Sequence, residues 1–425
     1  MHTGGRADRR DGVRSVRKEQ KMKTAKLMIC ALCVCLLGGC ADVPKNVVSK
    51  AEERDNNSLS AAADAKLETI SVSELKADAE RALSEKYSNF TLSDKINVRL
   101  PENYMQCDFV QTDGFTARAD ELVSRFFDAE QLGGIRPEQS SWDYSKAFSH
   151  RTSGFRDEEK EIHYCLWDNG FLCFMKGQLF KEQIECGKVR KIYHADRKDD
   201  LSDKYDLNGT ELSVAEAVEA ANKWLDENYA DLVPDYKVSV KTVLARQNDY
   251  GENALQFNAH LTYKGIELDE LNQIVKAGSS GIRYANKRII LIMKNGTDID
   301  YFTNGDGMLR PKEGQSLEKI ISLSSALRSI ESTFTDFEAP PELGSIGLKY
   351  TLAPQYDADL PAEQAIPYNA PGTEYKGRLV WEFVIDVPHS LIPEDNDPGD
   401  VRRYIYVDAE NGSIDFEFDL NKLRQ

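Results

Sequence analysis

A histidine and a cysteine that stand two positions apart, His163 and Cys165, have the clearest potential for chemistry in this chain. Side chains two apart on a strand face the same side of a sheet, so the histidine could activate the thiol as a nucleophile. A catalytic dyad also needs contact geometry and a third, orienting group, and the nearby sequence offers no such group. We interpret the two as ordinary strand residues, and we expect the protein not to be an enzyme.

Metal chemistry has little support in the sequence. His163, Cys165 and His194 could contribute ligands, but their number is short and their spacing generic. The acidic run at residues 394–400 lacks the alternation and the twelfth-position glutamate of an EF-hand loop. P-loop, dinucleotide and Gly-x-Ser-x-Gly motifs are absent from the sequence. We therefore predict neither a cofactor nor a metal site, and a thiol or metal hydrolase is the least favoured alternative.

A disulfide is the remaining chemistry open to the cysteines. Outside a reducing cytoplasm an even set could pair, here Cys107, Cys165, Cys173 and Cys186. A three-residue turn at residues 168–170, with Gly170 left-handed, places Cys165 opposite Cys173 within bridging distance. A two-residue turn instead places the two thiols on opposite faces. We expect buried thiols, because cysteine suits apolar strands, and keep the Cys165–Cys173 disulfide as the alternative.

The N-terminal region predicts a lipid anchor. Basic residues precede an apolar segment at residues 27–37, which is too short to span a bilayer and has the order of a secretory signal. The tetrad Leu37-Gly38-Gly39-Cys40 resembles the lipobox of bacterial lipoproteins. That resemblance implies a signal peptide at residues 1–39, cleavage before Cys40 and diacylglycerol on its thiol. The alternative is a plain signal peptide with a chance cysteine, and translation could start at Met1 or Met22.

Composition limits the partners of the mature protein. The whole chain of 425 residues has a net charge of −17, and removing residues 1–39, with their nine Lys/Arg and three Asp/Glu, leaves −23. Nucleic acid and anionic headgroups would be repelled by this charge. We therefore expect an acidic protein held by its lipid on the extracytoplasmic face of the cell membrane. Its length suggests two to three domains.

Hydrophobic patterns predict a tether, one leading helix and three units of similar order. Residues 40–66 are polar and form the lipidated cysteine and a flexible tether, and residues 72–87 form an amphipathic helix. The first unit has a strand at 96–100, a helix at 115–127 and a hairpin at 164–174. In the second, Ser213 and Glu216 form a capping box for a helix, and strands follow at 236–245, 255–263, 288–293 and 299–302. The third has a helix at 316–329 and strands at 348–352, 378–387, 402–407 and 413–418.

This order leads to an α+β fold of tandem repeats, each a helix packed on a small antiparallel sheet. The expected domains are an N-terminal α+β domain at residues 67–205 and repeats at 206–310 and 311–425. The turns Asn295-Gly296 and Asn411-Gly412 support the match of the last two, although Asn-Gly is also common in unrelated hairpins.

The last repeat carries a family resemblance. GRLVWEFV at residues 377–384, followed by YVDAENGSI at 406–414, resembles the end of PepSY-like domains. The preceding repeat departs from that pattern, with Asn258 and His260 where the Trp-Glu-Phe core would lie. The mature chain is similar to a family of clostridial lipoproteins with PepSY-like repeats and, more distantly, to anchored regulators of sensor kinases. The resemblance implies a binding or regulatory module with no catalytic residues to transfer.

Two functions follow from these observations. The first is a non-enzymatic module that acts on a membrane or envelope protein, such as a sensor kinase, transporter or protease, because exposed sheet edges can accept a strand. The second is a peptide-binding or small-molecule-binding protein, motivated by aromatic residues that could line a site but are expected in the core. These aromatic residues are Trp142, Tyr144, Trp167 and Trp381.

Overall fold

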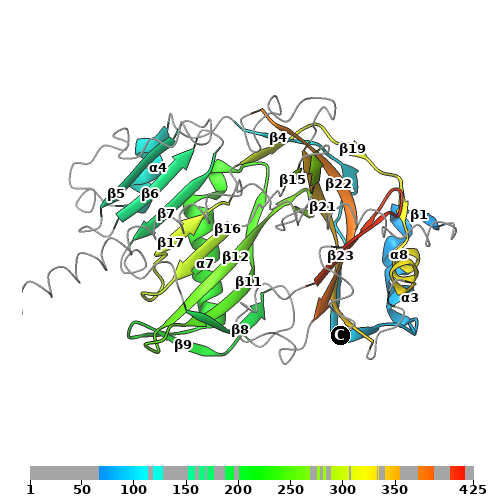
Figure 1. Cartoon of the computed structure of the whole chain (residues 1–425), viewed down its shortest axis with the longest axis horizontal. Helices are drawn as coiled ribbons and strands as arrows, with labels where there is room; N and C mark the ends of the chain where they lie inside the picture. Colours follow the sequence, from blue (N-terminus) through cyan, green and yellow to red (C-terminus); the bar gives the residue numbers. More distant parts are fainter. Residues whose placement is uncertain are drawn as a thin grey trace, which may run out of the picture. The chain divides into compact units, whose positions relative to one another are not determined.

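Most of the strands that the structure describes hydrogen-bond into one large sheet (Figure 1). In this computed structural model, half of the residues that the structure describes are in strands and 21% are in helices. The structure describes residues 67–112, 118–127, 152–157, 162–167, 170–176, 187–195, 201–268, 275–277, 281–283, 289–305, 308–332, 334, 340–354, 372–386 and 403–416. The chain divides into units at residues 1–58 and 59–425, and all described residues belong to the second.

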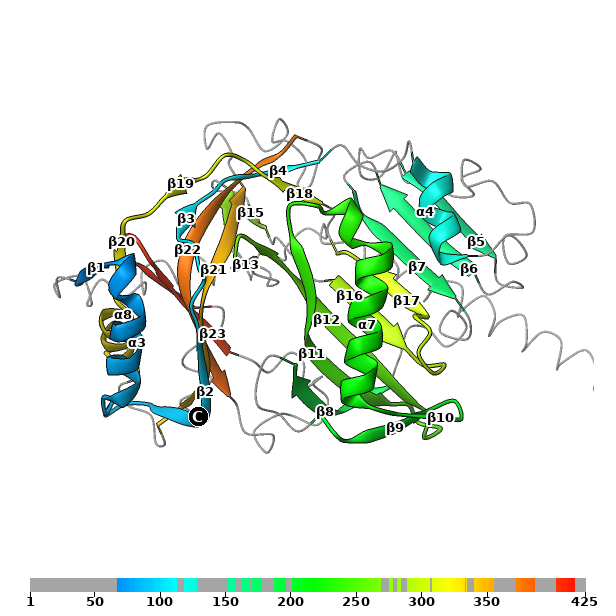
Figure 2. The same cartoon turned by 180° about the vertical axis from the view of Figure 1, so that it is seen from behind.

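One part of the sheet is a run of antiparallel strands. In spatial order they are β5 (Thr152–Asp157), β6 (Ile162–Trp167), β7 (Leu172–Lys176), β17 (Tyr301–Thr303), β16 (Ile289–Met293), β12 (Asn253–Tyr263), β11 (Lys237–Gln247) and β8 (Lys188–His194). Figure 2 shows two helices on one face of this part, α7 (Val214–Asn228) over β11 and β12 and α4 (Ala119–Phe126) over β5 and β6. The hairpins expected here are confirmed, although the first-unit helix is shorter than residues 115–127.

Helix α7 forms where its local sequence predicts it. The Ser213 hydroxyl accepts from the Glu216 amide at 3.2 Å, and the Glu216 carboxylate accepts from the Ser213 amide at 2.8 Å, so the capping box is confirmed. Val214, Ala217 and Leu225 are fully buried at helical spacing against the sheet. Capping fixes where the helix starts, and the apolar stripe fixes which face meets β11 and β12.

The second part of the sheet gathers strands from both ends of the described sequence. Its strands are β2 (Thr91–Arg99), β4 (Phe109–Gln111), β18 (Leu309–Pro311), β21 (Glu342–Pro354), β22 (Glu374–Asp386), β23 (Arg403–Asp408) and β24 (Ile414–Phe416). Strand β2 pairs in parallel with β21, and β22 pairs with both β21 and β23 in antiparallel register. Trp381 of β22 is fully buried and donates to the Ile321 carbonyl at 2.9 Å, so it is a core residue.

A short strand, β13 (Ile266–Leu268), joins the two parts. It pairs antiparallel with the end of β12 and parallel with β21, so hydrogen bonding is continuous from β5 to β22. The described residues thus form a 16-stranded sheet. The expected fold class, an α+β series of helices each packed on its own small sheet, is therefore wrong. The order of local elements carried no information on which strand edges would pair.

The N-terminal segment packs on the C-terminal part of the chain. A 3-10 turn, η2 (Val72–Glu74), leads into α3 (Leu75–Ser84), which confirms the first predicted helix. Strand β1 (Thr69–Ser71) pairs with β20 (Lys319–Ile321), and α3 lies beside α8 (Leu323–Glu331). The helix predicted at 316–329 instead begins at Leu323. Ile320 and Ile321 belong to β20, and the Ser322 hydroxyl caps the helix.

Smaller elements complete the description. They are η5 (Ala230–Leu232) and three two-stranded sheets, formed by β9 (Lys204–Leu207) with β10 (Thr210–Ser213), β14 (Val275–Ala277) with β15 (Gly281–Arg283), and β3 (Met105–Gln106) with β19 (Gln315–Ser316). Among the described helices, none is long and apolar enough to cross a membrane. Several predicted features lie outside the described residues: the signal peptide, Cys40, the tether, Cys186, the acidic run at 394–400, Trp142 and Tyr144.

Candidate functional site

The structure places the predicted cysteine pair directly opposite each other. Strands β6 and β7 pair with Cys165 facing Cys173, the register expected for the three-residue turn, and Gly170 has a φ of 85° as that turn requires. Both residues are thiols in the structure. Cys165 is buried and Cys173 half-buried, so neither presents an open nucleophile. The disulfide between them stays the alternative to the expected buried thiols.

The other sequence candidates are spread over separate strands. His163 on β6 lies opposite Met175, and His194 on β8 lies opposite Thr242 of β11. Burial raises the pKa of the Cys107 thiol to about 11, which disfavours a reactive thiolate. Within the described ranges, no three His, Cys, Asp or Glu side chains gather closely enough to hold a metal ion.

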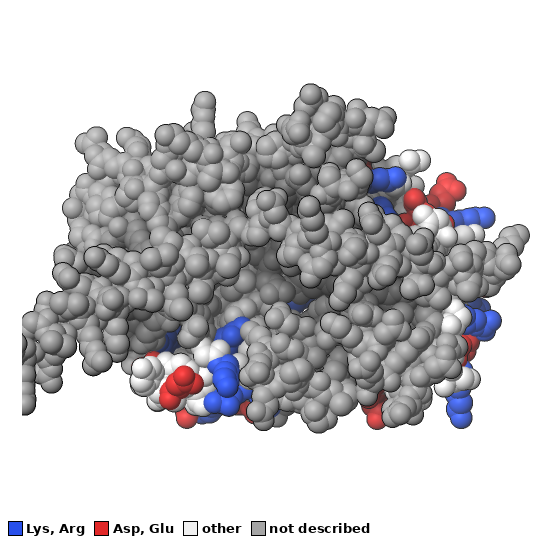
Figure 3. All heavy atoms as spheres, viewed as in Figure 1, with Lys and Arg blue, Asp and Glu red and all other residues white. Residues whose placement is uncertain are grey.

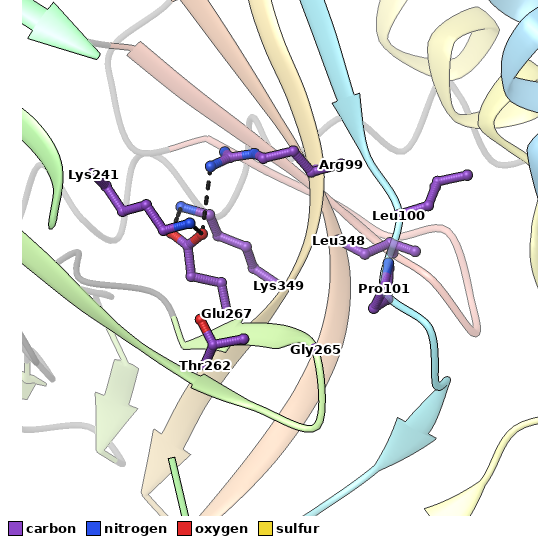
Figure 4. Close-up of a pocket in the computed structure, with 10 residues that line it drawn as sticks. Arg99, Leu100, Pro101, Lys241, Thr262, Gly265, Glu267, Leu348 and Lys349 are labelled. Carbon is purple, nitrogen blue, oxygen red and sulfur yellow. Dashed lines mark hydrogen bonds and ion pairs between the residues drawn. The ribbon is translucent and has the colours of Figure 1, made fainter. Parts of the chain in front are cut away.

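A different set of residues comes together where β13 meets β21. Three cations, Arg99, Lys241 and Lys349, approach the carboxylate of Glu267 from three strands (Figure 4). Lys349 Nζ lies 3.1 Å from Glu267 Oε1, Arg99 Nη1 lies 3.4 Å from Oε2, and Lys241 Nζ lies 3.8 Å from Oε2. His260 Nδ1 also contacts Glu267 Oε1. We call these five residues the Glu267 cluster.

Strand register explains the cluster. Glu267 and Lys349 are direct partners in the parallel β13–β21 pair, and Glu267 also faces Thr262 across the β12–β13 hairpin. His260 is two residues from Thr262 and so lies on the same face of β12. The hairpin needs a two-residue turn, and Lys264 and Gly265 provide it with φ values of 47° and 88°, the left-handed pair of a type I′ turn.

Strand geometry also places the other two cations. The pairing of β11 with β12 shifts between Val240 and Thr242, so Lys241 is the extra residue of a β-bulge, a feature that redirects a side chain. Arg99 faces Gly347 across the β2–β21 pair. A Cβ at position 347 would lie 3.6 Å from the Arg99 guanidinium. This is ordinary van der Waals contact, so Gly347 adjoins the guanidinium without being required for its placement.

A second carboxylate extends the charge network. Glu382 Oε1 on β22 lies 3.0 Å from Lys349 Nζ and 3.9 Å from Arg99 Nη2. Lys349 therefore bridges two carboxylates, and all three side chains are at least nine-tenths buried. Removing one partner from such a buried network leaves an uncompensated charge and costs about 3–5 kcal/mol.

Glu267 is ionised at neutral pH. Burial raises its pKa, but the positive charges of Lys349, His260 and Arg99 outweigh that effect and hold the pKa well below its usual range. The cluster and Glu382 together bring three basic side chains against two carboxylates.

The surface beside the cluster is hollowed. A pocket of about 160 Å³ is bounded by the polar groups of Arg99, Lys241, Thr262, Glu267 and Lys349 and by an apolar rim. Its other lining residues are Leu100, Pro101, Gly265, Gly347 and Leu348. Lys241 and Arg99 are 21% and 27% exposed, so their charges reach the solvent side of the pocket. A small anionic group could sit here against two cations.

Sequence reasoning missed this site, although it carries a signal. Lys349 stands between Leu348 and Tyr350, and Glu382 between Trp381 and Phe383, so each charge interrupts an apolar strand. A charged residue in a buried strand needs a partner. Which partner it has depends on the β13–β21 register, which no local pattern gives.

Comparisons with known proteins give no functional assignment. No protein-family model matches the chain, and no curated protein matches it either. A crystal structure of an uncharacterized protein from Eubacterium rectale ATCC 33656 is similar with a TM-score of 0.45 and 13% identity, over 80% of this chain and 98% of that one. The resemblance to PepSY-like clostridial lipoproteins stays a prediction.

Proposed function

We propose that this chain is a non-enzymatic binding protein, anchored at the extracytoplasmic face of the membrane through Cys40, that recognises an anionic group in the pocket beside Glu267. This develops the peptide-binding or small-molecule-binding alternative from the sequence. The observation that carries it is the convergence of Arg99, Lys241 and Lys349 on Glu267 in the lining of that pocket.

The charges favour a guest that is negative. Arg99 and Lys241 line the pocket and are partly exposed, so a guest there meets basic side chains. Arg99 offers a planar fork that suits carboxylate or phosphate oxygens, and Lys241 adds a point charge. A buried network that already holds its own cations in place presents them with little further loss of side-chain entropy on binding.

The pocket volume limits what can enter. A volume of about 160 Å³ lies below the range of roughly 300–1,000 Å³ typical of pockets that enclose a whole drug-sized ligand. The pocket therefore suits a small anion, or the carboxylate or phosphate end of a larger ligand whose remainder lies outside.

A thermal-shift titration tests this function. Inorganic phosphate and succinate are titrated separately at constant ionic strength. A ligand present at about 100 times its dissociation constant stabilises the folded protein by about 2.7 kcal/mol. We expect at least one of them to raise the melting temperature with concentration. Lys241→Ala should weaken that response about tenfold in dissociation constant, which corresponds to about 1.4 kcal/mol.

A matched variant separates a site from general charge. Lys223 on α7 is 73% exposed and lies outside the pocket, so Lys223→Ala removes the same charge without touching the cluster. Its titration should equal that of the unmodified protein. If neither anion shifts the melting temperature, or if the two lysine variants respond alike, the proposal is wrong.

A further inference from the structure

Three turns meet at the end of the sheet farthest along β12 from the Glu267 cluster. They are the turn between β9 and β10, the turn between β11 and β12, and the turn that follows β16. A groove of about 300 Å³ runs between them. Its lining is mostly polar and consists of Asp206, Asn208, Gly209, Tyr250, Gly251, Glu252, Asn253, Lys294 and Asn295.

Hydrogen bonds fix the turns against one another. Asn208 Nδ2 donates to Asn295 Oδ1 at 2.9 Å, and Asn253 Nδ2 donates to the Asp206 carbonyl at 3.2 Å. Lys294 Nζ lies 3.3 Å from Glu252 Oε2 and so ties the third turn to the second. A groove built from turns that are already joined needs little ordering when a ligand binds.

The same bonds leave acceptors for a guest. Asp206 accepts from the Gly209 amide through Oδ1, and Glu252 uses Oε2 for both Asn248 and Lys294. Among the described residues, the second oxygen of each carboxylate has no hydrogen-bond or ion-pair partner. Both residues are exposed, so these oxygens face a guest or water.

An aromatic ring stands at the rim. Tyr250 is 86% exposed, and it is the large hydrophobic residue that stands out as exposed among those the structure describes. Its amide donates to Asn248 Oδ1 at 3.0 Å, which holds the turn that presents the ring. A tyrosine ring offers an apolar face and a polar hydroxyl, and it loses little conformational entropy when covered.

The charge and the residue types of the groove limit the chemical class of its ligand. Two carboxylates and one lysine give the groove a net negative charge, which disfavours phosphates, carboxylates and other anions. Two carboxylates, one of them bound to a lysine, are too few for a metal site. The carboxylate and amide groups suit a neutral molecule that has many hydroxyl groups along one edge. The exposed Tyr250 ring suits a molecule that also has C–H groups on one face.

We propose that this groove binds a neutral saccharide, with a sugar ring stacked on Tyr250 and its hydroxyl groups hydrogen-bonded to Asp206, Asn208 and Glu252. The site is separate from the Glu267 pocket, and its ligand is of a different class. The volume of about 300 Å³ is at the lower end of the ligand-pocket range and suits one or two sugar units.

Calorimetric titration of the purified chain tests the proposal with three defined probes, maltotetraose, cellotetraose and chitotetraose, each up to about 10 mM. We expect at least one to bind. Tyr250→Ala should raise its dissociation constant about tenfold, whereas Tyr250→Phe, which keeps the ring, should stay within about threefold of the unmodified protein. Because Tyr250 is exposed, neither variant should alter the melting temperature.

The outcomes are distinct. Binding that Tyr250→Ala weakens and Tyr250→Phe retains supports the site. If none of the three saccharides binds, or if Tyr250→Ala binds as well as the unmodified protein, the proposal is overturned. Lys223→Ala, at an exposed position of α7, should leave saccharide binding unchanged. The anion titration is a separate measurement, so failure of the anion site and failure of the saccharide site can be told apart.

Discussion

Asp78 on α3 accepts two hydrogen bonds from Ser324 at the start of α8, one from its amide at 3.2 Å and one from its hydroxyl at 2.8 Å. The two residues are 246 positions apart in the sequence. Asp78 thus acts as a second cap for a helix in another part of the chain, and a carboxylate is favoured at a helix N-terminus. This contact attaches the first described helix to the C-terminal part of the protein.

Replacing Asp78 with alanine should therefore destabilise the whole protein. The Ser324 amide and hydroxyl are buried and would lose their partner, so we expect Asp78→Ala to lower the free energy of unfolding by about 2–3 kcal/mol. Urea denaturation followed by circular dichroism measures this. Glu80→Ala, at an exposed position of the same helix, is the control and should change stability by less than about 0.5 kcal/mol. Equal effects would mean that the cap contributes nothing.

The Glu267 cluster should also be a stability determinant. Glu267→Gln keeps the shape but removes the charge that compensates Lys349 and Arg99, so we expect a loss of about 3–5 kcal/mol at pH 7. Glu342→Gln, at an exposed position at the start of β21, is the matched control and should have little effect. Chemical denaturation of the three proteins measures the difference. A Glu267→Gln variant as stable as the control would contradict the assigned role.

The same residue predicts a pH dependence. The pKa of Glu267 lies well below its usual range in the folded protein, so its stabilising contribution is present above the unfolded-state pKa of about 4.3 and is lost as pH falls through the folded-state value. Between about pH 5 and pH 3, the unmodified protein should lose stability more steeply than Glu267→Gln. Parallel profiles would show that Glu267 does not titrate as its cations require.

The register of β6 and β7 predicts that Cys165 and Cys173 can be oxidised to a disulfide. Directly opposed strand residues have Cα atoms about 4.5–5.5 Å apart, within the range of a bridge. Treatment with diamide should lower the intact mass by two hydrogens and protect both thiols from alkylation. Cys173→Ser should abolish this change. If both cysteines are still alkylated after diamide treatment and unfolding, the pair does not bridge.

Lipidation at Cys40 stays a prediction from the sequence. Metabolic labelling of bacterial cells that express the chain with an alkyne fatty acid should mark the protein, and Cys40→Ala should lose the label and the membrane association. Cys35→Ala, in the expected leader, should keep both. Label on the Cys40→Ala protein would exclude the lipobox interpretation.

In-cell crosslinking with the Cys40→Ala protein as control tests the expected sensor kinase, transporter or protease partner.

Local elements could be predicted because their determinants lie close together in the sequence. The capping box of α7 involves Ser213 and Glu216, and the Cys165–Cys173 hairpin closes around Gly170. The start of α8 was predicted too early because Ile320 and Ile321 have helical spacing with later residues. Their pairing with β1, about 250 positions earlier, overrides that pattern.

The fold class and the site depend on strand pairings between distant parts of the chain. Neither could therefore be predicted from the sequence. The β13–β21 pair spans only two residue pairs, Glu267 with Lys349 and Leu268 with Tyr350. It nevertheless merges two runs of strands into one sheet and places the buried carboxylate beside its cation. Nothing in the short run from Ile266 to Leu268 distinguishes it from a loop, because three residues are too few for a period to be seen.

The parallel pairing of β2 with β21 has a consequence for the order of folding. Thr91 pairs with Glu342, so the partner of an early strand is made some 250 residues later. Closing so long a loop is slow compared with forming a helix or hairpin. Until α8 and β21 are synthesised, the apolar sides of α3 and β2 lack these native partners and are open to chaperones or to aggregation. The segment made first among the described residues is therefore among the last to reach its native position.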